Sequence, residues 1–247
     1  MKIIASDYDG TLNHGGIDDK KRAAIKKWRD SGNIFAIVSG RGMKDALDIL
    51  KKDNLEIDYF VATNGAIILN SKGEKVSDIR CDGDIAKPLL KLMFEIGCRW
   101  GCVLTDFPCM IYADKSKCKE IGEYSLENAP LISYFNQIST ALPDYETAEK
   151  VTATIKEKFE EYVNPLQNGT CIDIVRSDMD KAKGIYLLLD ILNCKYEDVI
   201  AVGDNINDAA MIKEFRSYAM NNGVNYIKEL ADYTTESVTE LIEKELQ

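Results

Sequence analysis

The chain has 247 residues, 45% of them hydrophobic, and its 31 Lys and Arg against 41 Asp and Glu give a formal net charge of −10. This length allows one or two domains with a substantial core. An acidic chain without a basic tract is unsuited to nucleic acid or an anionic membrane surface, and no obligate protein partner is evident. No apolar stretch approaches the ~20 residues of a membrane span. Scattered cysteines and a first strand that leaves no room for a signal peptide predict a cytoplasmic protein.

The N-terminal part alternates short apolar runs with amphipathic segments. Strands are expected at residues 2–6, 33–38 and 58–63, with helices between them at residues 18–31 and 43–50. Asn64-Gly65 follows the third strand. This dipeptide is typical of a hairpin turn, which residues 66–69 and 75–79 would extend.

The pattern changes near residue 83. The segments that follow predict a helix over 85–96, strands at 100–104 and 110–112, a long helix over 144–162 and a strand at 170–175. This α+β pattern lies between two α/β parts. We therefore expect an inserted α+β domain at residues 83–177, with linkers near 82–84 and 177–180, and a core domain formed by residues 1–82 and 178–247.

The α/β pattern resumes after the insertion. An apolar helical stripe begins at Lys183-Gly184, and a fully apolar strand at residues 199–202 ends at Gly203-Asp204. Helices over 208–215, 224–230 and 237–246 and short strands near 218–220 and 233 complete the chain. Strands that alternate with helices indicate a parallel sheet, so the predicted fold class is α/β with an inserted second domain.

Polar residues follow five of the predicted strands. They are Asp7, Ser39, Asn64, Asp204 and Asn221. One such residue is a weak sign, because loops are polar in any case. Ligands of open α/β sheets bind at the carboxyl ends of the strands. Since all five residues stand at that end, the pattern predicts one shared site.

The first of these strand ends carries two carboxylates, in Asp7-Tyr8-Asp9-Gly10-Thr11. In extended backbone Asp7 and Asp9 would point to the same side, and Gly10 lets the chain turn close to a ligand. One carboxylate can attack phosphorus and form an aspartyl-phosphate, and the other can protonate the leaving oxygen and then activate water. The alternative interpretation is an ordinary Asp-Gly turn after a strand.

A second acidic run, Gly203-Asp204-Asn205-Ile206-Asn207-Asp208, follows the strand at 199–202. Two acidic clusters at strand ends repel each other unless a cation lies between them. Clusters of oxygen ligands suit Mg²⁺, which completes its shell with water and substrate phosphate. Asp204 can bind the metal, while Asn207 and Asp208 orient water, phosphate or a lysine. The alternative is a run that caps the following helix.

A hydroxyl group and a lysine are the candidates for binding phosphate. The Ser39 hydroxyl precedes Gly40 and a predicted helix, whose N–H groups form a natural anion site, although an N-cap serine would look the same. Lys183 can place a point charge over phosphate, with Lys181 as a close rival and a solvated surface lysine as the alternative. The only histidine, His14, receives no catalytic role.

Taken in order, these motifs resemble those of the haloacid dehalogenase superfamily, and most of all its Cof-like (type IIB capped) sugar-phosphatase subfamily. The motifs that carry the resemblance are Asp7 to Thr11, Ser39-Gly40-Arg41, Asn64-Gly65-Ala66, Lys183-Gly184 and Gly203-Asp204-x-x-Asn207-Asp208. The resemblance implies a Rossmann-like parallel sheet with the Asp7 strand between the Ser39 and Asp204 strands. It also implies that the insertion is a cap.

The resemblance further implies a role for each motif. Asp7 would be the nucleophile and Asp9 the general acid and base. The Mg²⁺ ligands would be Asp7, the Asp9 carbonyl and Asp204, with Asp208 in support, while Ser39 and Lys183 would bind the phosphoryl group. We also expect the phosphate or substrate site to include Gly10, Thr11, Gly40, Asn64 and Asn207. Tyr8 replaces the commoner leucine or methionine, and its side chain should point away from the site.

The function expected from these features is Mg²⁺-dependent hydrolysis of small phosphate monoesters, such as sugar phosphates, through an aspartyl-phosphate. One alternative is a phosphomutase or phosphotransferase on the same fold. Another is a signalling module that accepts phosphate on Asp7. Asp9 argues against a signalling module, because a base two residues from the nucleophile hastens loss of the phosphate that a switch must keep.

Overall fold

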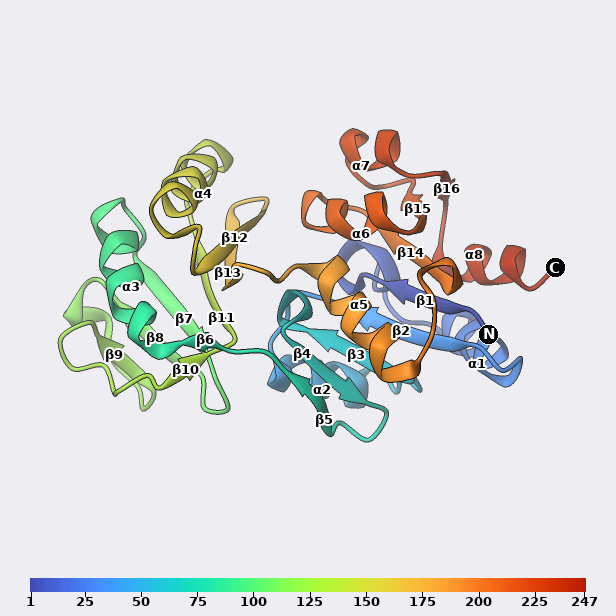
Figure 1. Ribbon diagram of the computed structural model, residues 1–247, viewed down its shortest axis with the longest axis horizontal. Helices are drawn as coiled ribbons and strands as arrows, with labels where there is room; N and C mark the ends of the chain where they lie inside the picture. Colours follow the sequence, from blue (N-terminus) through green and yellow to red (C-terminus); the bar gives the residue numbers. More distant parts are fainter. The chain divides into compact units, whose positions relative to one another are not determined.

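The computed structural model of the protein describes residues 1–247. The chain divides into two compact units, one of Met1–Ser77 with Lys181–Gln247 and the other of Asp78–Asp180. The linkers expected from sequence, near 82–84 and 177–180, fall at or a few residues inside the ends of the second unit. In Figure 1 the first unit runs from blue to cyan and again from orange to red, and the second is green to yellow. No helix is both long and apolar enough to cross a membrane.

An eight-stranded sheet forms the centre of the first unit, in the order β16-β15-β14-β1-β2-β3-β4-β5. The strands are β1 (Ile3–Ser6), β2 (Ile34–Val38), β3 (Tyr59–Ala62), β4 (Ile67–Asn70), β5 (Lys75–Asp78), β14 (Val199–Gly203), β15 (Arg216–Met220) and β16 (Tyr233–Thr235). β1 is parallel to β14 on one side and to β2 on the other. The predicted central place of the Asp7 strand is therefore confirmed.

The hairpin that follows β3 departs from the parallel pairing of β14, β1, β2 and β3. β4 pairs with β3 in antiparallel register, with Val61 opposite Ile68. The turn between these strands holds Thr63 and Asn64 at φ of 49°, in the left-handed region. This conformation is unusual for a β-branched threonine. The hairpin predicted from Asn64-Gly65 is confirmed.

Helices cover both faces of this sheet because successive strand residues point to opposite sides. The helices are α1 (Asp19–Asp30), α2 (Met43–Lys52), α5 (Lys181–Leu192), α6 (Ala209–Glu214), α7 (Asn225–Leu230) and α8 (Val238–Glu245). Ile4 packs with Trp28 of α1 and Leu241 of α8. Its neighbour Ile3 belongs to a separate core with Ile185 of α5. The first unit thus has three layers, and the predicted α/β class is confirmed.

The second unit contains a six-stranded sheet in the order β12-β13-β11-β7-β8-β9 and a two-stranded pair, β10-β6. Its elements are β6 (Cys81–Asp82), α3 (Ala86–Glu95), β7 (Trp100–Leu104), β8 (Cys109–Tyr112), β9 (Glu123–Ser125), β10 (Tyr134–Phe135), β11 (Gln137–Ala141), α4 (Tyr145–Phe159), β12 (Val163–Asn168) and β13 (Cys171–Arg176). Val103 and Ile138 of the sheet share a core with Leu89 of α3 and Ile155 of α4. The unit has the α+β character expected of it.

Candidate active site

Asp7 is the first residue after β1, and its position is fixed by the backbone. Its N–H donates to the carbonyl of Val202 in β14, at 2.9 Å, and the residue is only 5% exposed. The chain then turns sharply, with Gly10 at φ of 82°. A Cβ on Gly10 would lie 2.4 Å from Oδ2 of Asp204. Only glycine therefore lets this loop approach the acidic run after β14.

The acidic run after β14 is held by the side chain of Asp208. This buried carboxylate accepts hydrogen bonds from the backbone N–H groups of Asp204, at 2.9 Å, and Asn205, at 3.0 Å. Asp208 therefore orders the loop that carries Asp204. In addition, the Thr11 hydroxyl donates to Oδ1 of Asp204 at 2.6 Å. Asp204 is thus fixed from both of the loops that meet here.

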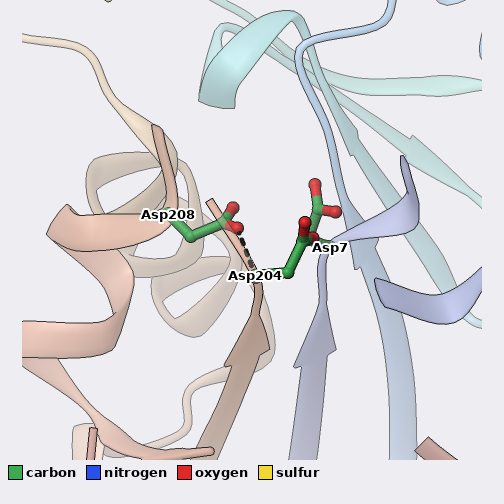
Figure 2. Close-up of side chains that lie close together, drawn as sticks. All are labelled: Asp7, Asp204 and Asp208. Carbon is green, nitrogen blue, oxygen red and sulfur yellow. Dashed lines mark hydrogen bonds between the residues drawn. The ribbon is translucent and has the colours of Figure 1, made fainter. Parts of the chain in front are cut away.

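Three carboxylates come together at this edge of the sheet. Oxygen atoms of Asp7, Asp204 and Asp208 all lie within 4.8 Å of one another. Figure 2 shows Asp7 and Asp204 at the ends of neighbouring strands, with the Asp208 carboxylate pointing toward them from the following loop. The adjacency of β1 and β14 produces this convergence, because parallel strands deliver their C-terminal residues to one edge.

A lysine lies within this carboxylate group, but it is Lys181 and not the predicted Lys183. The Lys181 ammonium donates to Oδ1 of Asp7 at 2.6 Å and to Oδ1 of Asp208 at 2.5 Å, and the side chain is fully buried. Lys183 is exposed, with its Nζ 5.7 Å from the centre of the Tyr186 ring. The prediction of Lys183 as the lysine of the site is therefore wrong.

The helical period explains the error. An α-helix turns by ~100° per residue, so residues two apart point to nearly opposite sides. The buried stripe of α5 contains Ile185, Leu188 and Leu189. Lys181 precedes Ile185 by one turn and lies on this stripe, whereas Lys183 does not. A search for the lysine in phase with the stripe would have selected Lys181.

The group carries more negative charge than one lysine can balance. Burial raises the pKa of Asp7 to about 8, even though Lys181 acts to lower it. Burial also raises the pKa of Asp204. For Lys181, burial acts to lower the pKa, but the charges of Asp208 and Asp7 outweigh it and the pKa is raised. When all three carboxyls are ionised, one ammonium leaves two negative charges, and a divalent cation held by oxygen atoms would balance them.

The second predicted carboxylate, Asp9, is not part of this group. Its Oδ2 accepts a hydrogen bond from Nε of Arg41 at 2.7 Å, and its Oδ1 accepts one from Nη2 at 2.8 Å. The structure therefore does not bring the Asp9 carboxylate together with that of Asp7. Arg41 is part of the Ser39-Gly40-Arg41 motif, but spacing along the sequence does not reveal its partner.

Two of the predicted phosphate-binding residues, Ser39 and Asn64, contact each other where β2 and β3 end. Ser39 is buried, and its hydroxyl accepts from the N–H of Arg41 at 3.3 Å. Its carbonyl accepts from the N–H of Asn64 at 3.0 Å. Ser39 is not the N-cap of α2, because that position belongs to Gly42. The Ser39 hydroxyl therefore does not cap α2, and the N-cap alternative is wrong.

The other residues that were predicted for the site do not all lie with the three carboxylates. Gly40 and Asn207 are partly exposed, and Asn207 lies outside the group of three. The amide of Asn222 donates to the carbonyl of Gly10 at 2.9 Å. Asn221, which was expected at the site, instead donates to Glu236. Asn222 is thus a contact of the Asp7 loop that the sequence did not reveal.

The position of Lys181 depends on a close approach between α5 and the β3–β4 turn. A Cβ on Gly184 would lie 2.4 Å from Cα of Gly65 and 2.8 Å from Cγ1 of Val61. We expect Gly184→Ala to push the first turn of α5 away and to lower the free energy of unfolding by about 1–3 kcal/mol. Lys183→Ala, on the exposed side of the same helix, is the control and should change it by less than ~0.5 kcal/mol. Urea titrations of both variants would check this, and equal stability would contradict the contact.

Comparisons with known proteins identify the family of the chain. The family described as haloacid dehalogenase-like hydrolases matches residues 4–241. Because the match spans nearly the whole chain, the protein belongs to this family. The phosphatase YcsE of Bacillus subtilis, named for 5-amino-6-(5-phospho-D-ribitylamino)uracil, is 27% identical over 96% of this chain and 90% of its own length.

Solved structures share the fold. A haloacid dehalogenase-like hydrolase from B. subtilis superposes with a TM-score of 0.83 at 18% identity, covering 98% of this chain and 99% of its own. BT4131, described as a subclass IIB sugar phosphatase of the same superfamily, gives a TM-score of 0.80 at 19% identity, covering 99% and 98%. The family and the phosphatase names among its relatives support a phosphatase enzyme of the Cof-like type.

Proposed function

We propose that the protein is a Mg²⁺-dependent phosphatase that hydrolyses small phosphate monoesters through an aspartyl-phosphate on Asp7. The observation that carries this proposal is the buried group of Asp7, Asp204 and Asp208 with Lys181 in contact. Such a set places a nucleophilic carboxylate beside a fixed positive charge and an oxygen-only cation site. These are the elements that phosphoryl transfer requires, since its catalysis is mostly positioning and charge stabilisation.

In the first half of the reaction, an oxygen of Asp7 attacks phosphorus and the ester oxygen leaves. Lys181 holds one oxygen of Asp7 at 2.6 Å and thereby fixes the direction of the carboxylate. Ser39 is the candidate for binding a phosphoryl oxygen, because its buried hydroxyl lies at the end of the neighbouring strand. Asp9 is the candidate that protonates the leaving oxygen and, in the second half, takes a proton from the attacking water.

The donor set fits Mg²⁺. Asp7 and Asp204 would hold the ion, with Asp208 in support through the backbone of the Asp204 loop. When bound, the ion balances the charge of the carboxylates and of the phosphoryl group. The side chains of this group offer carboxylate oxygens, and the Asp9 carbonyl remains the expected third ligand. Magnesium prefers such oxygen ligands over the nitrogen and sulfur ligands typical of zinc.

The inserted unit is the proposed source of substrate choice. All residues given a chemical role belong to the first unit, so the chemistry does not require side chains of Asp78–Asp180. We propose that this unit acts as a lid that excludes water and contacts the leaving group. The name of YcsE makes phosphorylated sugar-like compounds the first class to test here.

Metal removal tests the proposed function directly. We expect release of inorganic phosphate from a panel of phosphate monoesters to stop in excess chelator. It should return with Mg²⁺ but much less with Ca²⁺, whose larger and looser shell misplaces the reacting groups. Steady phosphate release, without isomer formation, separates a phosphatase from a phosphomutase. Full turnover in chelator, or no turnover of any ester with Mg²⁺, would overturn the proposal.

A further inference from the structure

The ion pair between Asp9 and Arg41 engages both oxygens of the proposed acid–base residue. Both carboxylate oxygens of Asp9 accept hydrogen bonds from the Arg41 guanidinium, at 2.7 and 2.8 Å. This two-point contact directs the Asp9 carboxylate toward Arg41, although each oxygen keeps a further lone pair. To turn toward a leaving oxygen, Asp9 would have to give up at least one of the two hydrogen bonds.

The guanidinium of Arg41 also lies over the ring of Tyr8. The guanidinium carbon lies 5.8 Å from the centre of the Tyr8 ring, within the range of a cation–π contact. Tyr8 is buried, and its hydroxyl donates to the carboxylate of Asp53. The tyrosine is thus itself fixed. It can keep the guanidinium near the loop after β1 when the pair with Asp9 opens.

Arg41 belongs to the loop after β2, and its side chain reaches the loop after β1. Its backbone N–H donates to the hydroxyl of Ser39, the candidate for binding phosphate. Its side chain reaches Asp9, two residues after the nucleophile Asp7. Both members of the pair are about half exposed, at 41% for the Arg41 side chain and 49% for that of Asp9. An incoming anion therefore has access to this guanidinium.

A phosphoryl group is a stronger partner for this guanidinium than Asp9 is. The planar fork of arginine binds two oxygens of phosphate as well as two oxygens of a carboxylate, and phosphate carries the greater charge. An exposed ion pair contributes little to stability, typically ~0–1 kcal/mol. Breaking the Asp9–Arg41 pair so that phosphate can replace Asp9 therefore costs little interaction free energy.

We propose that Arg41 is a phosphate-binding residue held in reserve by Asp9. The phosphoryl group of the substrate competes with Asp9 for the guanidinium, and its arrival frees Asp9 for proton transfer. This inference rests on the proposed function of the site. It adds a residue to the binding of the phosphoryl group, and it assigns to the ion pair the task of holding the Asp9 carboxylate on Arg41 until substrate is present.

A double-mutant cycle on phosphate binding tests the exchange. Calorimetric titration of inorganic phosphate, with MgCl₂ present, would compare the wild type, Asp9→Asn, Arg41→Gln and the double variant. If Asp9 competes for Arg41, Asp9→Asn should tighten phosphate binding by about tenfold, and Arg41→Gln should weaken it. In the Arg41→Gln background the same Asp9→Asn change should have at least ~5-fold less effect, because no guanidinium is left to release.

The cycle also excludes a simple charge effect. Removing the Asp9 charge tightens anion binding by long-range electrostatics even without competition, and that part would be equal in both backgrounds. Asp45→Asn is the matched control, because Asp45 lies close enough to act on the charge of Arg41 but makes no hydrogen bond to it. It should leave phosphate affinity within about twofold. Equal tightening by Asp9→Asn in both backgrounds would overturn the inference.

The outcomes separate this inference from the proposed function. If the wild type hydrolyses phosphate esters with Mg²⁺ but the cycle shows no coupling, the ion pair is structural and only the inference fails. If no variant binds phosphate and the wild type hydrolyses no ester, both fail. Thermal unfolding of each variant confirms that it is folded, which is expected because both side chains are half exposed.

Discussion

Replacing Lys181 with methionine should reduce turnover of any phosphate ester by about 10²–10³-fold, the usual effect of removing one preorganised charge from an active site. Methionine has similar length, so the packing of α5 is retained while the charge is lost. The change also leaves the carboxylates of Asp7 and Asp208 without their shared partner in a buried site. Breaking a buried ion pair in this way typically costs about 3–5 kcal/mol of unfolding free energy.

Lys183→Met is the matched control for this experiment. It is the same substitution two residues along the same helix, at an exposed position. Turnover and unfolding free energy should both stay close to the wild-type values. Steady-state kinetics and denaturant titrations of the two variants would decide between the lysines. A larger loss of activity in Lys183→Met than in Lys181→Met would show that the pairing seen here is not the functional one.

Asp7→Asn should abolish turnover, by on the order of 10⁴-fold or more, because it removes the atom that forms the covalent intermediate. The substitution is nearly isosteric and removes one of the buried negative charges, so the protein should remain folded. Mass spectrometry after an acid quench should find phosphate on the wild type during turnover and none on the variant. Near-normal turnover in Asp7→Asn would contradict the assignment of the nucleophile.

Asp9→Asn provides the comparison for the Asp7 variant. Loss of a general acid and base typically lowers the rate by ~10²–10⁴-fold. The first step should survive with an aryl phosphate, whose leaving group needs no proton. A phosphoenzyme should therefore form slowly in Asp9→Asn and decay slowly. The two carboxylates would then have different roles. Asp7 would be required for the phosphoenzyme to form at all, whereas Asp9 would set how fast the phosphoenzyme forms and decays.

The carboxylates of the site could be predicted from the sequence because a residue that follows a parallel strand has a predictable place at the edge of the sheet. Asp7 and Asp204 each end a fully buried strand, and parallel neighbours must bring such residues to one edge. To choose between Lys181 and Lys183, one must know which side of α5 faces the core. The two lysines are only two residues apart, so they differ mainly in the side of the helix on which they lie. The Lys183 assignment failed for this reason, although the apolar stripe of α5 held the information.

Other features of the site depend on contacts that no local pattern encodes. The pairing of Asp9 with Arg41 joins residues 32 positions apart, and that of Asn222 with Gly10 joins residues 212 apart. In the second unit, β12 was missed because it is a polar strand that contains Pro165. A proline is tolerated there because β12 lies at the edge of its sheet, where a missing N–H interrupts no ladder on the outer side.

The order of the strands has a consequence for synthesis of the chain. β1 receives β2 as a neighbour early, but its other neighbour, β14, begins only at Val199. Until the ribosome has passed that point, one edge of a strand that is fully buried in the folded protein lies without its partner. Such unpaired edges are prone to pair with other chains. The continuous unit Asp78–Asp180 can fold in the meantime. The carboxylate group therefore assembles late, because Asp204 and Asp208 reach Asp7 only when β14 has been made and pairs with β1, the first strand of the chain.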